Sequence, residues 1–559
     1  MEPIWLKNYP PGVPAEVDVH EFASLSAVLK RSCQRFADLP AYSSLGATIT
    51  YAELDRLCGA FSAYLQTVLG LKRGDRVAIM LPNLLQYPVA LFGILRAGMV
   101  VVNINPQYTR SELEHQLSDS GAVAIVVLEN FAHTLQKVLT ANPSLKPTVI
   151  TTEVGDMLAW PKKLLTNFVV RQVKKMVPDW KINGAIKFNA AMRRGAQLAL
   201  REVALGHSDI AFLQYTGGTT GVAKGAMLTH GNMVANVQQL AAWMGRDLQD
   251  GKEVYVCPLP LYHVYALASS LVFMKMGAHA ILITNPRDMP AFIHDLKKYP
   301  CTAIIGVNTL YRALMDAPAF ADVNFRQLKL ANAGGMAVQR VVAERWKKAT
   351  GVPLVEAYGL TETSPGAIAN PLDIADWTGT IGMPIPSTQA VILDEDDREL
   401  PVGEVGEICL RGPQVMAGYW QHPEETAKVF TPDGWLRTGD MGFMDARGYF
   451  KITDRKKDMI VVSGFKVFPN QIEDVVVMHP GVAEAAAIGA PDERSGEVVK
   501  IIVVKKDPLL TADELMAHCR KHLTGYKVPK IIEFREEPLP KTTIGKILRR
   551  QLRSSLVAH

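Results

Sequence analysis

The chain has few of the features that mark secreted, zinc-binding or membrane-spanning proteins. Its six cysteines lie far apart in 559 residues and form no Cys-x-x-Cys pair, which argues against a disulfide framework and a zinc site. The N-terminus has no apolar stretch long enough for a secretion signal, and no apolar run approaches the length of a membrane span. We therefore expect a cytoplasmic protein that touches a membrane, if at all, on the cytoplasmic face of the inner membrane.

Strong charge of either sign is also missing. The 60 lysines and arginines and the 55 acidic residues leave a formal net charge of +5, which is too small at this length to indicate a nucleic-acid partner. Hydrophobic residues make up 48% and charged residues 21% of the chain, as in an ordinary soluble globular protein. Because 559 residues exceed what one compact core can hold, we expect two to four domains.

Apolar runs alternate with helical patterns over roughly the first 380 residues. Strands are predicted at residues 76–81, 100–104 and 122–128, and the same alternation returns between residues 210 and 358. Since these strands show no internal polar alternation and are separated by helices, they predict parallel sheets covered on both faces.

Two changes of pattern follow. Short strands with turn residues between 389 and 410 predict a small β-rich subdomain at about 385–450. The charged run at residues 454–458 then separates two apolar segments, and a compact α+β pattern follows it. We therefore expect an α/β protein with a large N-terminal domain (1–455) of stacked, mostly parallel sheets with helices, which includes the β-rich subdomain, and a small mobile α+β domain (456–559).

One segment, residues 161–181, is basic and amphipathic. Its cations are Lys162, Lys163, Arg171, Lys174, Lys175 and Lys181, opposed only by Asp179. Its apolar residues fall on one helical face: Leu164, Leu165, Phe168, Val169, Val173, Met176 and Val177. Two interpretations stay open, because such a helix can pack its apolar stripe on the core or lie on an anionic membrane.

The most informative motif is a glycine–threonine loop. Residues 216–225 contain four glycines, three threonines and a lysine, directly after an apolar run. Glycines let backbone N–H groups approach phosphate oxygens, and hydroxyl and ammonium groups complete a polyphosphate cradle. The pattern is not a Walker A loop, because two residues separate Gly221 from Lys224 and Gly225 follows the lysine. The motif predicts nucleotide chemistry of another class.

Companion motifs follow in a fixed order at residues 358–363, 434–440, 454–458, 463–466 and 540–547. Together with the loop they resemble the adenylate-forming superfamily, and the likeness covers residues from about 25 to 552. The chain is most similar to bacterial long-chain fatty-acid–CoA ligases, on the residues at 82–90, 260–263, 306–310 and 434–474.

The resemblance implies a two-step reaction. A fatty-acid carboxylate attacks the α-phosphate of ATP to give an acyl adenylate and pyrophosphate, and the thiol of coenzyme A then expels AMP. Two anions meet in the first step, so the site needs cations and donors rather than a protein nucleophile. ATP, Mg²⁺, coenzyme A and a fatty acid are the implied ligands. An aromatic or medium-chain acid stays open as the substrate, as do a homodimer and a role in fatty-acid degradation or phospholipid recycling.

The resemblance also implies roles for individual residues. The implied catalytic residues are Lys546, Glu362 and His263, and Thr216 and Glu362 are the implied Mg²⁺ ligands. Implied cofactor-binding positions are Thr216, Gly217, Gly218, Thr219, Thr220, Gly221, Lys224, Gly334, Gly335, Tyr358, Gly359, Thr361, Asp440, Arg455, Ser463, Gly464 and Phe465. Among them the resemblance assigns the adenine face to Tyr358 and the ribose to Asp440 and Arg455. Five of these residues have a plainer alternative: a helix N-terminal carboxylate for Glu362, a core tyrosine for Tyr358, a turn residue for Asp440, a core histidine for His263 and a solvated lysine for Lys546.

The last implications concern motion and the acyl pocket. Lys457 is the implied hinge, about which the small domain rotates between the two steps to bring residues 463–465 to the thioester site. By position, the acyl-pocket candidates are Val307, Asn308, Tyr311, Gly335 and Leu267. A membrane-binding or scaffolding protein with an inactive adenylation fold is the alternative from another class, and the joint presence of Lys546, Glu362, Asp440 and Arg455 argues against it.

Overall fold

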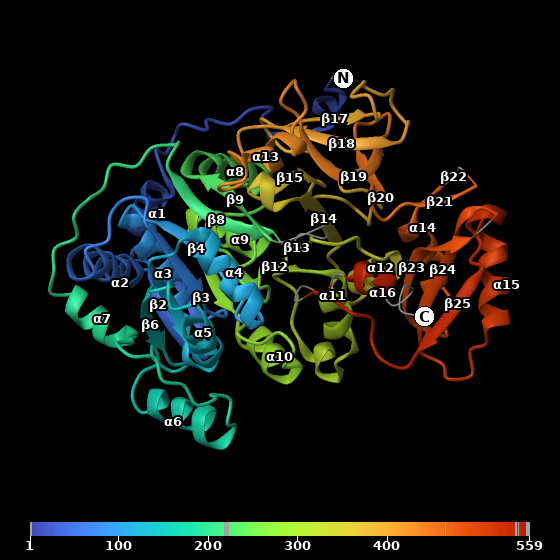
Figure 1. The fold of residues 1–559 in the computed structure, drawn as a ribbon. Helices are drawn as coiled ribbons and strands as arrows, with labels where there is room; N and C mark the ends of the chain where they lie inside the picture. The colour runs from blue at the N-terminus through green and yellow to red at the C-terminus, as the bar shows by residue number, and fades with distance from the viewer. Residues whose placement is uncertain are drawn as a thin grey trace.

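A computed structural model describes residues 3–216, 223–463, 465–492, 494–542, 545 and 547–554 (Figure 1). Seven residues of the implied site lie outside these ranges: Gly217, Gly218, Thr219, Thr220, Gly221, Gly464 and Lys546.

Two large sheets form the N-terminal part of the protein. The first has seven strands in the order β7 (Ile186–Lys187), β6 (Thr148–Thr152), β5 (Ala124–Leu128), β3 (Arg76–Met80), β4 (Val100–Asn103), β8 (Ile210–Thr216) and β9 (Lys224–Thr229). The second has nine strands in the order β16 (Met383–Pro384), β15 (Gly366–Ala369), β14 (Leu354–Gly359), β13 (Leu330–Ala333), β12 (Ala303–Gly306), β10 (Val254–Cys257), β11 (His279–Leu282), β1 (Pro40–Ser44) and β2 (Ala47–Thr50).

The interior pairs of both sheets are parallel, as the uninterrupted apolar runs predict. The edges differ from that prediction, because β9 on β8, β2 on β1 and the β14–β15–β16 edge are antiparallel. For β1–β2, β8–β9 and β14–β15 a short connection joins neighbours in the chain, and such a connection cannot contain the crossover helix that a parallel pair needs.

Two smaller sheets follow. The four-stranded antiparallel sheet has the order β17 (Gln389–Leu393), β18 (Gly406–Arg411), β19 (Leu436–Met444) and β20 (Phe450–Arg455). The last sheet contains β22 (Phe465–Val467), β21 (Ile460–Val462), β24 (Gly496–Lys505) and β23 (Val482–Asp492), with β25 (Ile531–Arg535) paired to β24. This C-terminal sheet has a hydrophobic core of its own and lies apart from the large sheets, at the right of Figure 1.

The helices connect and cover the strands. They are α1 (Leu25–Arg35), α2 (Tyr51–Ala63), α3 (Gln86–Arg96), α4 (Arg110–Ser120), α5 (Glu129–Ala141), α6 (Lys162–Phe168), α7 (Phe188–Gly195), α8 (His230–Met244), α9 (Val264–Lys275), α10 (Met289–Lys298), α11 (Asn308–Asp316), α12 (Arg340–Thr350), α13 (Pro423–Val429), α14 (Pro469–Val477), α15 (Ala512–His522) and α16 (Arg549–Ser554). The α/β class is therefore confirmed, with large N-terminal sheets and a smaller C-terminal unit. Within the described residues, none of these helices combines the length and the apolar character needed to cross a bilayer.

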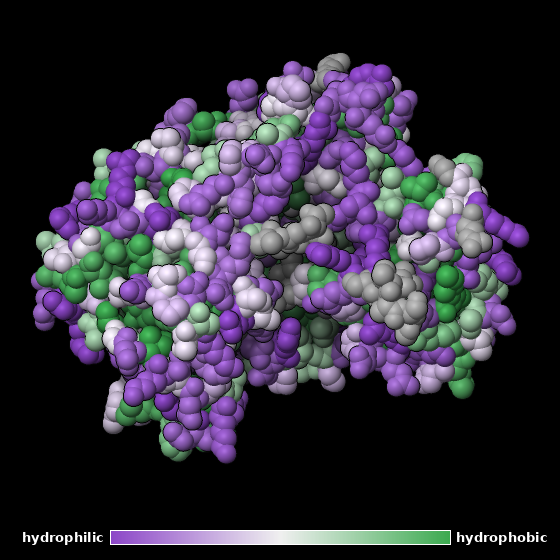
Figure 2. Space-filling model, in the orientation of Figure 1, coloured by the Kyte–Doolittle hydropathy of each residue, from purple (hydrophilic) through white to green (hydrophobic). Residues whose placement is uncertain are grey.

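The basic amphipathic segment does not pack on the core. It forms α6 and a continuing π-helical turn (Val169–Val173), which project from the body at the bottom of Figure 1. Leu165 is 63% exposed, Phe168 58% and Val173 63%. Figure 2 shows hydrophobic and hydrophilic residues side by side on this projection. Of the two interpretations, packing on the core is therefore wrong.

Candidate active site

A single large cleft contains the implied site residues that the structure describes in the N-terminal part. It encloses about 3420 Å³ and is lined from β8, β13, β14, β19, β20 and α9, and also by residues of the C-terminal unit. The carboxyl ends of parallel strands β12, β13 and β14 open into it, which is where ligands bind in open α/β sheets.

The end of β14 places two of these residues. A Cβ on Gly359 would lie 1.7 Å from the carbonyl oxygen of Pro365, so only glycine fits. The chain then turns into a 3₁₀ turn that contains Thr361 and Glu362. The Glu362 carboxylate accepts a 2.6 Å hydrogen bond from the Tyr419 hydroxyl, and this bond orients it at the cleft.

Tyr358, Asp440 and Arg455 form one contact group. The Tyr358 hydroxyl donates to Asp440 Oδ2 at 2.7 Å, and Arg455 Nε lies 3.4 Å from Asp440 Oδ1. Strand register explains the second contact, because Asp440 on β19 pairs with Arg455 on β20. Burial and the Asp440 carboxylate hold the pKa of Tyr358 well above its usual range, so its hydroxyl remains a donor.

The glycine pair follows β13. A Cβ on Gly334 would lie 3.2 Å from the Tyr265 ring, and Gly335 has a φ of +76°, so both positions favour glycine. The Tyr265 hydroxyl in turn hydrogen-bonds the Asn332 side chain. Tyr265 and Asn332 both line the cleft, and no motif in the sequence singles them out.

His263 begins α9 and lies in the cleft wall. Its Nδ1 accepts a 3.3 Å hydrogen bond from the backbone N–H of Tyr265, which caps the helix.

Thr216 and Lys224, the described ends of the glycine–threonine loop, lie side by side in the cleft wall. They are register partners at the ends of β8 and β9, and both line the cleft. Lys224 forms an ion pair with Glu425 on α13, and its ammonium lies 5.4 Å from the centre of the Tyr419 ring. Tyr419 therefore contacts both Lys224 and Glu362. Sequence reasoning missed Tyr419 and Glu425, which belong to none of the motifs.

A buried acid, Glu356, stands beside these residues on β14. It is 8% exposed and accepts hydrogen bonds from Val338 N at 2.9 Å and Trp377 Nε1 at 2.7 Å. Burial raises the pKa of Glu356 to about 7. The carboxyl group is thus held by two donors at the cleft wall.

The acyl-pocket prediction is partly wrong. Asn308 and Gly335 line the cleft, but Leu267, Val307 and Tyr311 do not. Tyr311 instead packs against Trp346, and its hydroxyl donates to Asn332 O at 2.6 Å. Helices α8 and α9 contribute six apolar lining residues: Leu240, Trp243, Met244, Ala268, Val272 and Phe273.

The C-terminal unit closes one side of the cleft. Gly545 has a φ of +84° and lies so close to Thr309 that a Cβ would come within 2.4 Å of the Thr309 hydroxyl oxygen. Arg312 Nη1 also donates to Ala483 O at 2.9 Å. In contrast, Ser463 and Phe465 lie outside the cleft lining, and Phe465 is 56% exposed and stacks on Tyr526.

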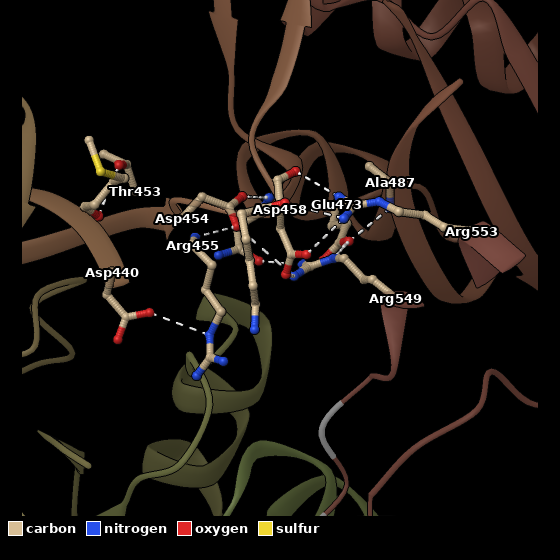
Figure 3. A network of polar contacts seen from close by, with 12 residues as sticks. Asp440, Thr453, Asp454, Arg455, Asp458, Glu473, Ala487, Arg549 and Arg553 are labelled. Carbon is tan, nitrogen blue, oxygen red and sulfur yellow. Dashed lines mark hydrogen bonds and ion pairs between the residues drawn. The ribbon is translucent and has the colours of Figure 1, made fainter. Parts of the chain in front are cut away.

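Polar contacts surround the implied hinge (Figure 3). Arg549 contacts Glu473, Asp458 and Asp454, and Arg553 contacts Asp458 and the carbonyl oxygen of Lys457. Asp454 is fully buried, and burial raises its pKa to about 6 although Arg549 opposes the shift. This network was not predicted from the sequence.

Comparisons with known proteins agree with this geometry. The family model described as AMP-binding enzyme matches residues 29–420, and the AMP-binding enzyme C-terminal domain matches residues 471–546. The long-chain-fatty-acid–CoA ligase of Escherichia coli O6:H1 is 54% identical over 99% of this chain and 98% of its own length. The enzyme of the same name from Bacillus subtilis is 40% identical over 98% of this chain and 97% of its own.

Solved structures share the fold. ATP-bound MatB from Rhodopseudomonas palustris superposes with a TM-score of 0.77 at 28% identity, over 95% of this chain and 98% of that one. An anthranilate CoA ligase in complex with anthranoyl-AMP gives a TM-score of 0.84 at 24% identity, over 97% and 99%. The cleft, the strand ends that open into it and the matched residues together lead to one conclusion: the chain belongs to the AMP-binding enzyme family.

Proposed function

We propose that the protein is an ATP-dependent long-chain fatty-acid–CoA ligase, which converts a fatty acid, ATP and coenzyme A to acyl-CoA, AMP and pyrophosphate. The observation that carries the proposal is the full-length identity of 54% to a ligase of that name. The contact group of Tyr358, Asp440 and Arg455 in the same cleft supports it, because these residues suit a nucleoside.

The adenosine end of the cleft is preorganised. Asp440 is fixed by one hydrogen bond and one ion pair, so its carboxylate can accept ribose hydroxyls without reorienting. Gly334 and Gly335 leave room for a base edge to approach the backbone, and Tyr358 supplies an aromatic ring beside it.

The phosphate end suits Mg²⁺. The carboxylate of Glu362 and the hydroxyl of Thr216 are hard oxygen donors in the cleft, of the kind that Mg²⁺ takes together with substrate phosphates and water. Within the described ranges no three His, Cys, Asp or Glu side chains converge on a metal position, so the two residues would hold the ion jointly with the phosphates. When bound, Mg²⁺ neutralises phosphate charge and so lowers the repulsion of the attacking carboxylate.

Two cations complete the first step. Lys224 can exchange Glu425 for a phosphate, because the ion pair lies in a partly exposed cleft wall. By family likeness Lys546 bridges the fatty-acid carboxylate and the α-phosphate. The neighbouring residue Gly545 lies against Thr309 in the cleft, which supports that role.

The apolar lining from α8 and α9 suits an alkyl chain. Trp243, Val272 and Phe273 give a wall without charged groups, and His263 caps the other end of α9 in the same cleft. A long chain gains about 0.8 kcal/mol for each methylene that it buries. An aromatic or medium-chain acid is the second candidate substrate. Such an acid would bury less of this wall and would gain less binding free energy from it.

The test measures pyrophosphate and AMP release with ATP, Mg²⁺ and a series of fatty and aromatic acids, with and without coenzyme A. We expect AMP formation that requires both coenzyme A and a long-chain acid, and its loss in Lys546→Ala but not in Lys530→Ala, which removes an exposed lysine. Sustained release of pyrophosphate over many turnovers without coenzyme A would refute the ligase, because the acyl adenylate would then have another acceptor. Activity with aromatic acids alone would support the second candidate.

We also propose that α6 and the turn after it dock the enzyme on an anionic membrane. Trp160, Leu164 and Leu165 are 79%, 59% and 63% exposed on a projection that also carries the exposed lysines Lys174 and Lys175. Apolar side chains flanked by cations match a bilayer of anionic lipids, in which long-chain acids themselves dissolve.

Vesicle co-sedimentation tests the docking surface. Each lysine near an anionic surface contributes about 1 kcal/mol, so Lys174→Glu with Lys175→Glu should weaken binding by at least roughly thirtyfold. The matched control is Arg520→Glu with Lys521→Glu, two exposed cations at the end of α15. Equal binding of the two double variants would refute docking through α6.

A further inference from the structure

Arg549 is the first residue of α16, and its guanidinium is nearly buried. Its side chain is 11% exposed and forms a two-pronged pair with Glu473 on α14, at 2.9 Å from Nε and 2.7 Å from Nη2. Nη2 also donates to Asn470 Oδ1 at 2.6 Å. These partners all belong to the C-terminal unit, so they would move with Arg549 in any rotation of that unit.

Two further partners lie at and beyond the hinge. Arg549 Nη1 is 3.4 Å from Asp458 Oδ2 and 4.0 Å from Asp454 Oδ1. Asp454 lies on β20, in the four-stranded sheet, three residues before Lys457. Its other oxygen accepts a 2.7 Å hydrogen bond from Asn470 N, again across Lys457. The buried carboxylate of Asp454 therefore joins the two sides of the hinge.

The helix that carries Arg549 is fixed to the C-terminal sheet. Leu552 and Ile547 pack with Ala486 and Ile488 of β23. Arg553, one helical turn after Arg549, donates to the carbonyl oxygens of Lys457 and Asp458 at 3.2 and 3.1 Å. Leu552 thus packs α16 on the sheet. Arg553 binds the hinge backbone, and Arg549 contacts the hinge carboxylates.

The same segment reaches the cleft at its other end. Gly545, four residues before Arg549, lies against Thr309 of α11. A rotation about Lys457 that removed Gly545 from Thr309 would separate Arg549 from Asp454 and leave Arg549 paired with Glu473. The Arg549–Asp454 contact is therefore specific to the orientation seen here.

We infer that Arg549 is a positioning residue: by pairing with Asp454 across Lys457 it holds the C-terminal unit in the orientation that places Gly545 in the cleft, the orientation for acyl-adenylate formation. The inference rests on the proposed ligase function for its kinetic consequence but not for its structural one. Removal of the contact should slow adenylate formation and spare the transfer to coenzyme A.

The first experiment measures the orientation directly. All six cysteines are buried, so spin labels can be placed on Lys348→Cys and Lys521→Cys, on the exposed faces of α12 and α15. We expect one dominant distance in the otherwise wild-type protein with ATP, and a second distance that most molecules adopt after Asp454→Asn or Arg549→Lys. An unchanged distribution in both variants would overturn the inference whatever the substrate of the enzyme is.

The second experiment separates the half-reactions. Adenylate formation is followed as pyrophosphate release in one turnover without coenzyme A, and transfer is followed from supplied acyl adenylate and coenzyme A. Asp454→Asn and Arg549→Lys should each slow the first reaction by about tenfold, the effect of one charged contact, and leave the second within about twofold. The double variant should be little slower than either single one, because both changes remove the same contact.

A control variant tests the merely structural alternative. Lys500→Gln breaks the 2.7 Å pair with Glu533 inside the C-terminal sheet, where Lys500 is also 11% exposed. It should lower the melting temperature without changing the ratio of the two rates. If Arg549→Lys slows both half-reactions equally, as a loss of folding would, the positioning role is refuted. If the wild type forms no adenylate from any acid, the proposed function fails. The distance measurement then still decides whether Arg549 fixes the orientation.

Discussion

The Asp440→Asn substitution tests the adenosine end of the cleft. It keeps the size of the side chain and removes its charge, so the contacts from Tyr358 and Arg455 lose their ionic partner. Hydrogen bonds to a charged group contribute about 1.5–3 kcal/mol and neutral ones about 0.5–1.5 kcal/mol. Two ribose hydroxyls that donate to a neutral amide at this position instead of to a carboxylate should therefore lose about 2–3 kcal/mol of binding in total.

That loss corresponds to a fall of roughly 30- to 150-fold in kcat/KM for ATP. The assay is AMP release at varied ATP with saturating fatty acid and coenzyme A, together with the melting temperature. Tyr358→Phe removes only one donor to the same carboxylate and should cost about tenfold or less.

Asp445→Asn is the matched control, because Asp445 follows β19 closely but pairs with Arg447 in an exposed turn. It should leave kcat/KM for ATP within about twofold, as expected of a surface ion pair. The reasoning is refuted if Asp440→Asn changes kcat/KM for ATP by less than about threefold, or if it changes the value for the fatty acid alone.

Three further substitutions have defined outcomes. Gly359→Ala should unfold or inactivate the protein, because its Cβ would overlap the Pro365 carbonyl oxygen at 1.7 Å; circular dichroism and activity measure this. For Glu356, burial raises the pKa to about 7 in the folded state, so the folded protein binds the proton more tightly than the unfolded chain. The stabilisation from this group is therefore fully present below the pKa of the unfolded glutamate, and about 3 kcal/mol of it is lost as pH rises through about 7. Urea unfolding at several pH values should show this decline in the wild type and not in Glu356→Gln. Ser269→Phe should narrow the cleft beside α9 and lower kcat/KM for sixteen-carbon acids at least about tenfold more than for eight-carbon acids.

Each of the three has a control or a contrary result. Gly525→Ala, where a Cβ meets nothing within 4 Å, should be tolerated, and equal damage by both glycine changes would contradict the steric argument. A pH-dependent decline that persists in Glu356→Gln would assign it to other groups. Equal loss for both chain lengths in Ser269→Phe would show that α9 does not line the alkyl site.

The sequence alone was enough to predict the α/β class and most strand positions. Uninterrupted apolar runs such as β3 and β5 are buried on both faces, and burial on both faces depends on local composition. The nucleotide motifs were also readable, because their glycines meet local backbone demands. Gly359 is an example because a Cβ there would overlap the nearby Pro365 carbonyl, and Gly545 is another because its φ is +84°.

Other features depended on residues far apart in the chain. Tyr419 joins Lys224 to Glu362, and Arg549 joins α14 to β20, over separations that no short motif spans. The antiparallel edge strands and the exposed face of α6 also followed from what the rest of the fold leaves uncovered. Local sequence therefore determined the strands, the turns and the residues that suit a nucleotide. Tertiary packing decided which side chains meet, because contact energies fall off within a few ångströms and only the folded chain brings such partners that close.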